Sequence, residues 1–495
     1  MLDQGGLRYK SGAGRWVVAA TVLGSGMASI DATVVGVALP TIGREFHASV
    51  AQLQWVVNGY TLTLAALLLV GGSFGDRFGR RRMFAIGVVW FTLASAACAL
   101  APDASVLIVL RVLQGMGAAL LTPGSLAILQ ASFREEDRGR AIGAWTGLGG
   151  VASAAGPFLG GYLIAVASWR WIFFINLPIG LVVLLLAIRH VPESRDDDAP
   201  RHVDVPGAVL VMTALAGITY GLIEGPAHGW HGPGPFVALA VGGAAACLFV
   251  LVEARSPAPL LPLDLFRRRQ FTVTNAVTFV VYGALGGVLF LLPVVLQVVD
   301  GYSPLASGVA LLPLTLVMLL LSSRSGRLAS RIGPRLQMTV GPVVVGCGLA
   351  LLSRVTTDSS YVTGVLPAVL VFGLGLAITV APLTATALSS APVEHAGLAS
   401  AVNNDVARIG GLIAVAVLPA LSGISGSAYL HPDELAAGFR TATLIAGLWC
   451  VAGGVVAGVG IRNRVEGEGA PAPVVPVHHE FIHCALDAPP QVICD

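Results

Sequence analysis

The sequence predicts an all-α protein that crosses a membrane many times. Only 11% of its 495 residues are charged, against about 25% in soluble globular proteins, and the mean hydropathy is +0.81. Apolar runs long enough to cross a bilayer, about 20 residues each, recur from residue 16 to residue 460. A soluble class is excluded, and the expected architecture is two six-helix halves with two extra central helices.

Fourteen apolar runs meet the length criterion, and no connection between them is large enough for a separate soluble domain. The first run is long enough to span and remain, so no cleavable signal peptide is expected. The expected spans are residues 16–39, 52–72, 83–101, 104–128, 140–166, 171–189, 205–224, 234–253, 272–298, 305–323, 337–353, 362–388, 398–421 and 439–460.

Basic residues fall on alternate connections between these spans. With the N-terminus in the cytoplasm, most of the 29 basic residues lie on the inner side. The positive-inside rule then places both termini in the cytoplasm of a cell-membrane protein. The expected inner segments are an N-terminus at 1–15, a linker at 190–204, a loop at 254–271 and a disordered tail at 461–495.

An internal repeat predicts how the spans are grouped. The stretch Gly72-Ser-Phe-Gly-Asp76-Arg77-Phe-Gly79-Arg80-Arg81 is echoed by Gly326-Arg-Leu-Ala-Ser330-Arg331-Ile-Gly333-Pro-Arg335. Aligning the two copies pairs residues 16–189 with residues 272–460 and leaves 205–253 as an insertion of two spans. Two parallel halves with a binding site between them at mid-membrane is a transporter architecture.

The first copy of the repeat is expected to form a charged, glycine-rich loop on the cytoplasmic face. Because Ser330 stands in the second copy where the first has Asp76, the acid is asymmetric. We expect the loop to latch the cytoplasmic side shut in the outward-facing state; the alternative is a purely topogenic signal. The residues expected to form the latch are Gly72, Asp76, Arg77, Gly79, Arg80 and Arg81, with Gly75 helping the turn to form.

Ionisable residues inside the spans are the functional candidates, because each costs about 2.5–3.5 kcal/mol at the bilayer centre on insertion scales. Asp31 lies fifteen residues past Trp16, or about 22 Å along a helix, and burial disfavours its charged form, as a reversible proton carrier requires. Arg111 always keeps its charge and shares a helix face with Gln114. The alternatives are a permanent structural pair for Asp31 and a structural clamp for Arg111.

Two further groups are possible linings of a cavity. Glu224 ends the seventh span, where a solvated helix end is an equal alternative. Asp405 and Arg408 are spaced i, i+3 on span thirteen, so an intrahelical ion pair is the simple interpretation. Asn403 and Asn404 lie beside them.

Glycine and proline are concentrated in the fifth span, where they bend a helix and allow close packing against its neighbours. The pattern Gly-Pro-x-x-Gly-Gly is more specific than the glycine that is common in membrane helices. The motif consists of Gly143, Gly156, Pro157, Gly160 and Gly161.

Metal and nucleotide chemistry are not expected. Four of the six cysteines lie in apolar runs, and His478, His479, His483 and Cys484 in the tail match no zinc spacing. No G-x-x-x-x-G-K-[ST] motif occurs, which argues against ATP hydrolysis by this chain. No cofactor is therefore expected.

These motifs together resemble the major facilitator superfamily, specifically its fourteen-helix drug:proton antiporters. The stretch Gly72–Arg82 resembles the motif between helices two and three, Arg111-x-x-Gln114-Gly115 that of helix four, and Gly143 to Gly161 the antiporter motif of helix five, with Ala152 in place of a glycine. Asp31-x-Thr33-Val-Val-x-Val-Ala-Leu-Pro40 resembles the helix-one signature, with Gly36 in place of Asn, and Trp169-Arg-Trp171-Ile-Phe-Phe-Ile-Asn176-Leu-Pro178 adds to the likeness.

The resemblance implies a major facilitator fold and proton-coupled export, with Asp31 and Arg111 in the coupling step. The expected cargo is a small hydrophobic or cationic drug or antibiotic; the alternative is an endogenous product such as a siderophore or secondary metabolite. A monomer in the lipid bilayer, driven by the proton gradient and without a nucleic-acid partner, is expected. An enzyme is not expected, because the group that most resembles a catalytic site, His431-Pro-Asp433, has no catalytic partner in the sequence.

Overall fold

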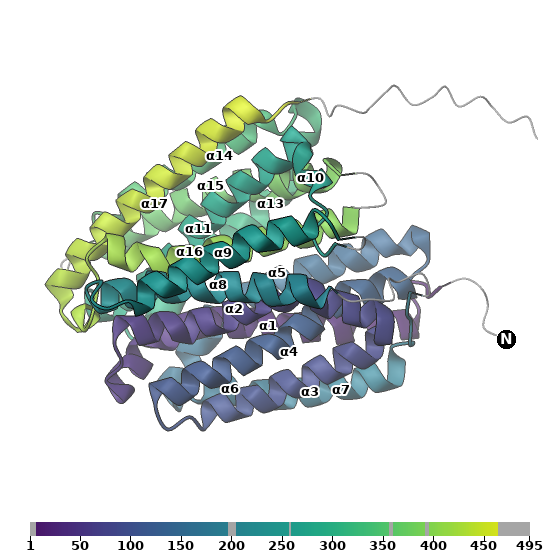
Figure 1. The fold of residues 1–495 in the computed structure, drawn as a ribbon, viewed down its shortest axis with the longest axis horizontal. Coiled ribbons are helices and arrows are strands. Elements are labelled where there is room, and N and C mark those ends of the chain that lie inside the picture. The colour runs from purple at the N-terminus through teal and green to yellow at the C-terminus, as the bar shows by residue number, and fades with distance from the viewer. Residues whose placement is uncertain (1–5, 197–203, 257–258, 356–359, 392–395, 464–495) are drawn as a thin grey trace, which may run out of the picture.

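The computed structural model describes residues 6–196, 204–256, 259–355, 360–391 and 396–463. Within these ranges the chain is helical, apart from short turns and one isolated bridge between Leu7 and Phe133. Among the described residues, fourteen helices are long and apolar enough to cross a membrane, as the sequence predicts. They lie side by side in one bundle (Figure 1).

The fourteen spanning segments agree with the predicted ones within a few residues at most ends, and several helices extend further. A short helix, α10 (Asp264–Arg267), lies between spans. The spans are α1 (Gly12–Phe46), α2 (Val50–Phe78), α3 (Arg80–Ala99), α4 (Ala104–Ser132), α5 (Glu135–Val166), α6 (Trp171–Phe174) with α7 (Asn176–His190), α8 (Val205–Ala227), α9 (Gly234–Glu253), α11 (Arg269–Val298), α12 (Pro304–Ala310) with α13 (Leu312–Ile332), α14 (Arg335–Leu352), a π-helical turn (Tyr361–Val365) with α15 (Leu366–Ser389), α16 (Ala396–Leu421) and α17 (Pro432–Gly460).

Polar residues at the helix ends set several of these boundaries. Ser49 and Gln52 form a capping box at the start of α2, and Asp103 accepts a hydrogen bond from the Val106 N–H at the start of α4. Such caps satisfy N–H groups that a helix leaves without an intrahelical partner. The short connections predicted by the sequence therefore begin and end at specific side chains.

The charged stretch at Gly72–Arg82 is not the loop that the sequence predicted. Residues up to Phe78 continue α2, and α3 begins at Arg80. Only Gly79 lies between the helices, with φ +104°, a value that side-chain-bearing residues rarely adopt. Gly72 and Gly75 are helical, so the prediction that they form the turn is wrong. In the second copy Gly333 takes the same place, with φ +85°.

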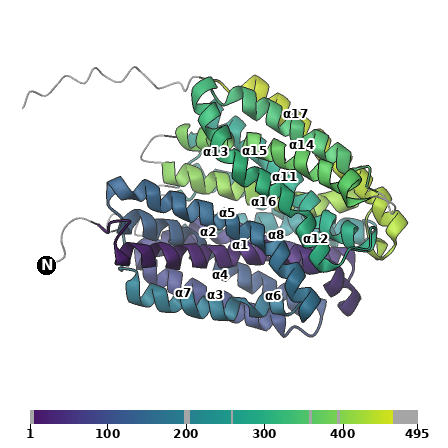
Figure 2. The same ribbon diagram turned by 180° about the vertical axis from the view of Figure 1, so that it is seen from behind.

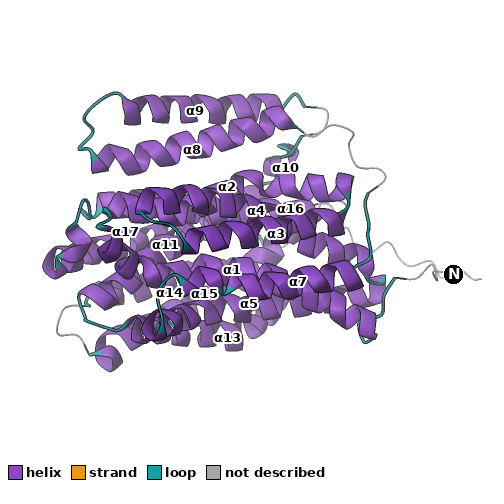
Figure 3. Cartoon of the chain, turned by 90° about the horizontal axis from the view of Figure 1, so that it is seen from below, coloured by secondary structure: helices purple, strands orange, loops and turns teal. Residues whose placement is uncertain are grey.

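Helices α1–α7 form one half of the bundle, and helices α11–α17 form the other (Figures 1 and 2). The hairpin of α8 and α9 stands at one side of both halves (Figure 3). Glycines allow the close helix contacts within a half: a Cβ on Gly71 of α2 would collide with the backbone of Ala119 in α4. The architecture of two halves with two extra helices is confirmed.

The two halves meet at one end of the bundle. We call the end that carries the turns at Gly79 and Gly333 the basic end, and the other the opposite end. Between described residues, the hydrogen bonds that join the halves lie toward the opposite end: Gln54 Nε2 donates to Val415 O (2.6 Å), Asn58 Nδ2 to Leu412 O (3.2 Å), Gln297 Nε2 to Val37 O (2.9 Å), the Val50 N–H to Gly426 O (2.9 Å) and Tyr429 OH to Ala48 O (2.7 Å).

Toward the basic end, α5 lacks such contacts. No atom lies within 4 Å of a Cβ placed on Gly143, Gly147 or Gly150, whereas one on Gly161 would lie 2.5 Å from Pro304 O of the other half. The largest buried apolar cluster also joins α1 to α11, through residues such as Leu39 and Leu292. The described conformation is therefore closed at the opposite end.

Candidate functional site

A buried ion pair lies at the centre of the N-terminal half. Arg111 Nη1 of α4 donates to Asp31 Oδ2 of α1 at 2.5 Å, and the two side chains are 1% and 0% exposed. The sequence placed both residues inside spans; the structure brings them into contact. An ion pair removed from water in this way is stable only when further hydrogen bonds satisfy its remaining atoms.

Two amide side chains supply those hydrogen bonds. Gln114 Nε2 donates to Asp31 Oδ1 (2.8 Å), and its Oε1 accepts from Arg111 Nη1 (2.8 Å). Asn176 Nδ2 of α7 also donates to Asp31 Oδ1 (3.2 Å) and to Ser95 Oγ of α3 (2.9 Å). Asp31 thus accepts from three side chains on two other helices, so both of its carboxyl oxygens have hydrogen-bond donors in this conformation.

Aromatic side chains and a backbone carbonyl enclose the guanidinium. The Arg111 Cζ atom lies 4.3 Å from the centre of the Tyr60 ring and 5.8 Å from that of Phe173. Arg111 Nε donates to Val56 O of α2 (3.1 Å), and Tyr60 OH donates to Ala28 O of α1 (3.3 Å). A desolvated cation–π contact holds the cation without neutralising it.

Sequence reasoning missed part of this cluster. Asn176 was named only within a motif, and Tyr60 and Ser95 were not candidates, because the prediction started from charged side chains inside the spans. Buried amides and hydroxyls in apolar runs are themselves costly without a partner. Asn176 and Ser95 could have been found by including them.

The glycine and proline motif of α5 packs against α1 in its own half and against α12 in the other half. A Cβ on Gly156 would collide with Thr33 Oγ1, and one on Gly160 with the side chain of Val34, both in α1. The Pro157 carbonyl lies against Gly308 of α12 in the other half. Gly143, by contrast, has no atom within 4 Å of its Cβ position.

The second predicted group, on α16, does not behave as one cluster. Asn403 Nδ2 donates to Thr278 Oγ1 (2.8 Å) and Asn275 Oδ1 (3.1 Å) of α11, whereas Asn404 is exposed and donates to Ser400 O. Asp405 and Arg408 form no ion pair among those that the described residues make, and Asp405 Oδ1 and Arg408 Nε are buried without a partner. The predicted intrahelical pair is therefore wrong for this conformation.

Asp405 and Arg408 lie on α16, which packs against α2 of the N-terminal half. We call this contact between α2 and α16 the seam between the halves. Ile409 and Leu412, on the neighbouring turn, pack with Leu62 of α2 in a small apolar cluster.

Glu224 is not a plain solvated helix end. Its Oε1 accepts a hydrogen bond from Trp55 Nε1 of α2 at 2.8 Å, and His228 lies 3.4 Å from its Oε2. The contact fixes α8 to the N-terminal half.

The charged residues after Gly72 bind within their own half. Asp76 pairs with Arg80 at 2.7 Å, and the Glu193 carboxylate accepts from the backbone N–H groups of Arg81 (3.0 Å) and Arg82 (3.2 Å). Glu193 therefore caps the start of α3. Arg77 stacks on Phe78. In this conformation no described contact joins Asp76 to the other half.

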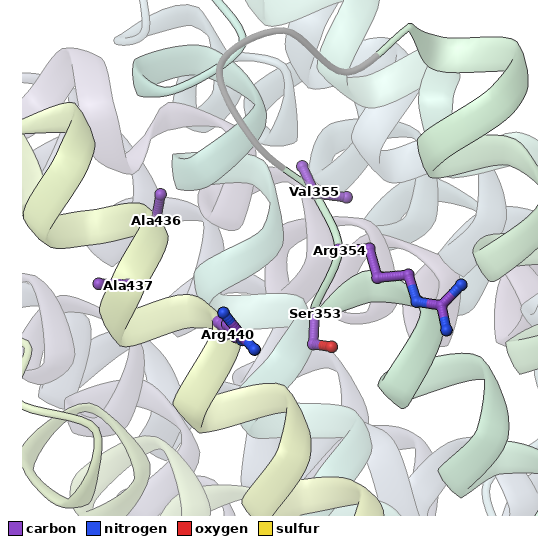
Figure 4. Close-up of a pocket in the computed structure, with 6 residues that line it drawn as sticks. All are labelled: Ser353, Arg354, Val355, Ala436, Ala437 and Arg440. Carbon is purple, nitrogen blue, oxygen red and sulfur yellow. The ribbon is translucent and has the colours of Figure 1, made fainter.

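Two other features lie away from this cluster. A pocket between α14 and α17 is lined by Ser353, Arg354, Val355, Ala436, Ala437 and Arg440 (Figure 4), near the opposite end. In the part of the chain that the structure describes, no group of three or more His, Cys, Asp and Glu side chains could hold a metal ion. The tail histidines and Cys484 lie outside the described residues.

Comparison with known proteins identifies the family. The sequence profile of the Major Facilitator Superfamily matches residues 21–415. The chain belongs to this superfamily. Its members are transporters rather than enzymes, and the fourteen spanning helices make this one a multi-pass membrane protein.

Curated relatives in the superfamily are named for antibiotic resistance. The chain is 38% identical over 403 residues (81% of this chain, 74% of the relative) to the tetracenomycin C resistance and export protein of Streptomyces glaucescens. It is 38% identical to the multidrug resistance protein Stp of Mycobacterium tuberculosis (83% and 76% covered) and 37% identical to the methylenomycin A resistance protein of Bacillus subtilis (85% and 90% covered).

The fold also matches solved major facilitator structures. A bacterial homologue of the human lysosomal transporter Spinster, in an inward-facing and unoccupied conformation, aligns with a TM-score of 0.66 at 16% identity, covering 91% of this chain and 97% of that one. At this identity the likeness supports the fold alone.

Proposed function

We propose that this protein is a proton-coupled antiporter that exports small hydrophobic or cationic drugs or antibiotics by alternating access. The observation that carries the proposal is the buried Asp31–Arg111–Gln114 network in a two-half transporter fold. The names of the relatives support antibiotic export as the direction and the cargo class. The proton gradient supplies the energy, and no cofactor is needed.

The orientation follows from charge. Arginines are concentrated at the basic end, so the positive-inside rule places this end, with both termini, in the cytoplasm of the cell membrane. The described conformation, closed at the opposite end, is then the inward-facing state. The transporter acts as a monomer in the bilayer, because each half supplies one side of the pathway.

Asp31 is the coupling residue in this proposal. In the inward-facing state it is ionised and held by Arg111, Gln114 and Asn176. In the outward-facing state a proton from outside neutralises the carboxylate, weakens these three hydrogen bonds and frees α1 to move relative to α4 and α7. Release of the proton to the cytoplasm restores the network.

The second candidate function, a dedicated exporter, differs from the first in the range of compounds exported and not in the mechanism. Some relatives are named for a single antibiotic and others for multidrug resistance. A dedicated exporter of one endogenous product, such as a siderophore or secondary metabolite, would use the same fold.

The deciding experiment is efflux of a panel of dyes and antibiotics from cells that produce this protein, with and without an uncoupler of the proton gradient. Efflux of several unrelated compounds, lost on uncoupling, is expected. Efflux of a single compound would support the dedicated exporter. Efflux that persists after complete uncoupling would contradict proton coupling.

A further inference from the structure

The α8–α9 hairpin covers the seam between the halves on one side of the bundle (Figure 3). Leu215 of α8 packs with Leu62 and Ala65 of α2 and with Leu412 of α16, and Ile223 packs with Ala51 and Ala416 nearer the opposite end. Trp55 ties α8 to α2 through Glu224 (2.8 Å). We call the end of the hairpin where α8 begins and α9 ends its base. An interaction that stabilises the base therefore also stabilises the packing of the hairpin over the seam.

Two carboxyl groups lie at that base. Asp204 precedes α8, and its Oδ1 accepts a hydrogen bond from the Gly207 N–H at 2.8 Å. Glu253 ends α9, and its Oε2 accepts from the Leu261 N–H at 3.0 Å. Glu253 is only 3% exposed. One oxygen of each carboxyl group is thus bound to a backbone N–H group.

The second oxygens face each other without a donor. Asp204 Oδ2 and Glu253 Oε1 are both buried and have no hydrogen-bond partner. Both lie on the same side of Gly207, because a Cβ placed there would be 2.8 Å from Asp204 Oδ2 and 2.7 Å from Glu253 Oε1. Two buried acceptors that share one site cannot both be ionised without a large cost.

No positive side chain resolves this conflict among the described residues. The groups that act on Glu253 are the Asp204 carboxyl group and the backbone N–H groups of Leu260 and Leu261. A divalent cation such as Ca²⁺ takes about six to eight oxygen ligands, which two free carboxyl oxygens do not supply. A single proton between them gives one O–H donor and one acceptor, and satisfies both atoms.

We propose that Asp204 and Glu253 bind one shared proton between Asp204 Oδ2 and Glu253 Oε1, and that this proton fastens the base of the α8–α9 hairpin. The site is separate from Asp31. It lies on the α8–α9 hairpin that packs over the seam, and it is not part of the coupling network. As pH rises the shared proton is lost, the two carboxylates repel each other, and the base of the hairpin separates. Low pH closes the base.

Infrared spectroscopy of the purified protein at neutral pH tests the proton directly. The wild-type protein is expected to show the C=O band of a protonated carboxylic acid that is lost in both Glu253→Gln and Asp204→Asn. Each variant replaces the proton with an amide N–H donor, so the base stays hydrogen-bonded and the fold is retained. Difference spectra cancel the other acids, and Asp264→Asn, an exposed acid nearby, should leave the band unchanged.

Hydrogen exchange at the start of α8 tests the consequence. After correction for the intrinsic exchange rate, the opening constant of residues 205–216 should rise about tenfold per pH unit in the wild type, because one proton is released on opening. In Glu253→Gln it should be independent of pH. Absence of the band, its persistence in both variants, or its removal by Ca²⁺ or Mg²⁺ at constant pH would overturn the proposal, as would a pH-independent opening in the wild type.

Discussion

At the scale of single residues, the central feature is that Asp31 and Arg111 neutralise each other inside the membrane. Breaking such a buried pair by removing one partner typically costs about 3–5 kcal/mol, because it leaves an uncompensated charge. Replacing both partners with neutral groups removes that penalty. Stability and transport therefore respond differently to single and double substitutions.

We expect Asp31→Asn to lower thermal stability in detergent strongly and to abolish proton-driven efflux. Combining it with Arg111→Gln should recover most of the stability, since no charge is left buried, but no transport. Melting temperatures and uncoupler-sensitive efflux of the three proteins check this. If the double variant recovered transport, the pair would be a structural clamp, the alternative that the sequence left open.

Asp300, in the connection between α11 and α12, gives a prediction for pH. Burial raises the pKa of Asp300 from 3.8 to about 6, and both of its carboxyl oxygens lack a partner. An acid whose pKa is raised on folding stabilises the fold below its unfolded pKa, and this contribution is lost as pH rises through about 6.

Asp300→Asn should therefore raise the melting temperature at pH 8 and lower it or leave it unchanged at pH 4. Because Asp300 as a whole residue is only partly buried, solvent screening reduces the effect to about 1 kcal/mol, or about 1–2 °C for a protein of this size. Thermal unfolding at the two pH values checks the sign. An equal shift at both would show that the ionisation of Asp300 is not involved.

At the scale of elements, the sequence predicted the helices well because apolar length is a local property. The predicted spans 104–128 and 234–253 match α4 and α9 closely. The stretch at Gly72–Phe78 failed because charged and glycine residues suggested a loop, whereas hydrogen bonding continued to Gly79. Only the turn itself needs a residue with positive φ, and composition does not show which glycine supplies it.

The site was predictable in its members but not in its contacts. Asp31, Arg111 and Gln114 stand out as polar groups in apolar runs, yet their meeting depends on how α1 packs against α4. For Asp405 and Arg408, by contrast, the sequence predicted a contact that the structure does not show. Their i, i+3 spacing allows an ion pair, but the packing of α16 against α2 leaves both with unpartnered atoms.

The α5 motif gives an element-scale prediction with a control on the same helix. Gly156→Ala should reduce stability and transport, because the added Cβ collides with Thr33 Oγ1 of α1, which is already bonded to Ser153 O. Gly147→Ala should leave stability unchanged or raise it slightly, because no atom lies within 4 Å of its Cβ position and alanine is favoured over glycine in a helix by about 0.5–1 kcal/mol. Melting temperatures of both variants check this, and equal losses would show that the close approach to α1 does not decide the outcome.

At the scale of the whole molecule, the halves are held together at the opposite end by backbone contacts too close for any side chain. A Cβ on Gly161 would lie 2.5 Å from Pro304 O and 2.7 Å from Leu305 Cα. The substitution Gly161→Ala should therefore destabilise the described conformation selectively. A shift in population requires only such a difference between the two states.

Spin labels at Gly139 of α5 and Leu328 of α13, both toward the basic end, would report that shift. In Gly161→Ala we expect the distance distribution between the labels to move to shorter values, because the opposite end opens as the basic end closes. Asp76→Asn should move it to longer values if Asp76 latches the basic end shut in the other state. Gly147→Ala is the matched control, with an unchanged distribution in the described state. If Gly161→Ala left the distances unchanged, the two ends would not be coupled through α5 and α12, and the contact would serve stability alone.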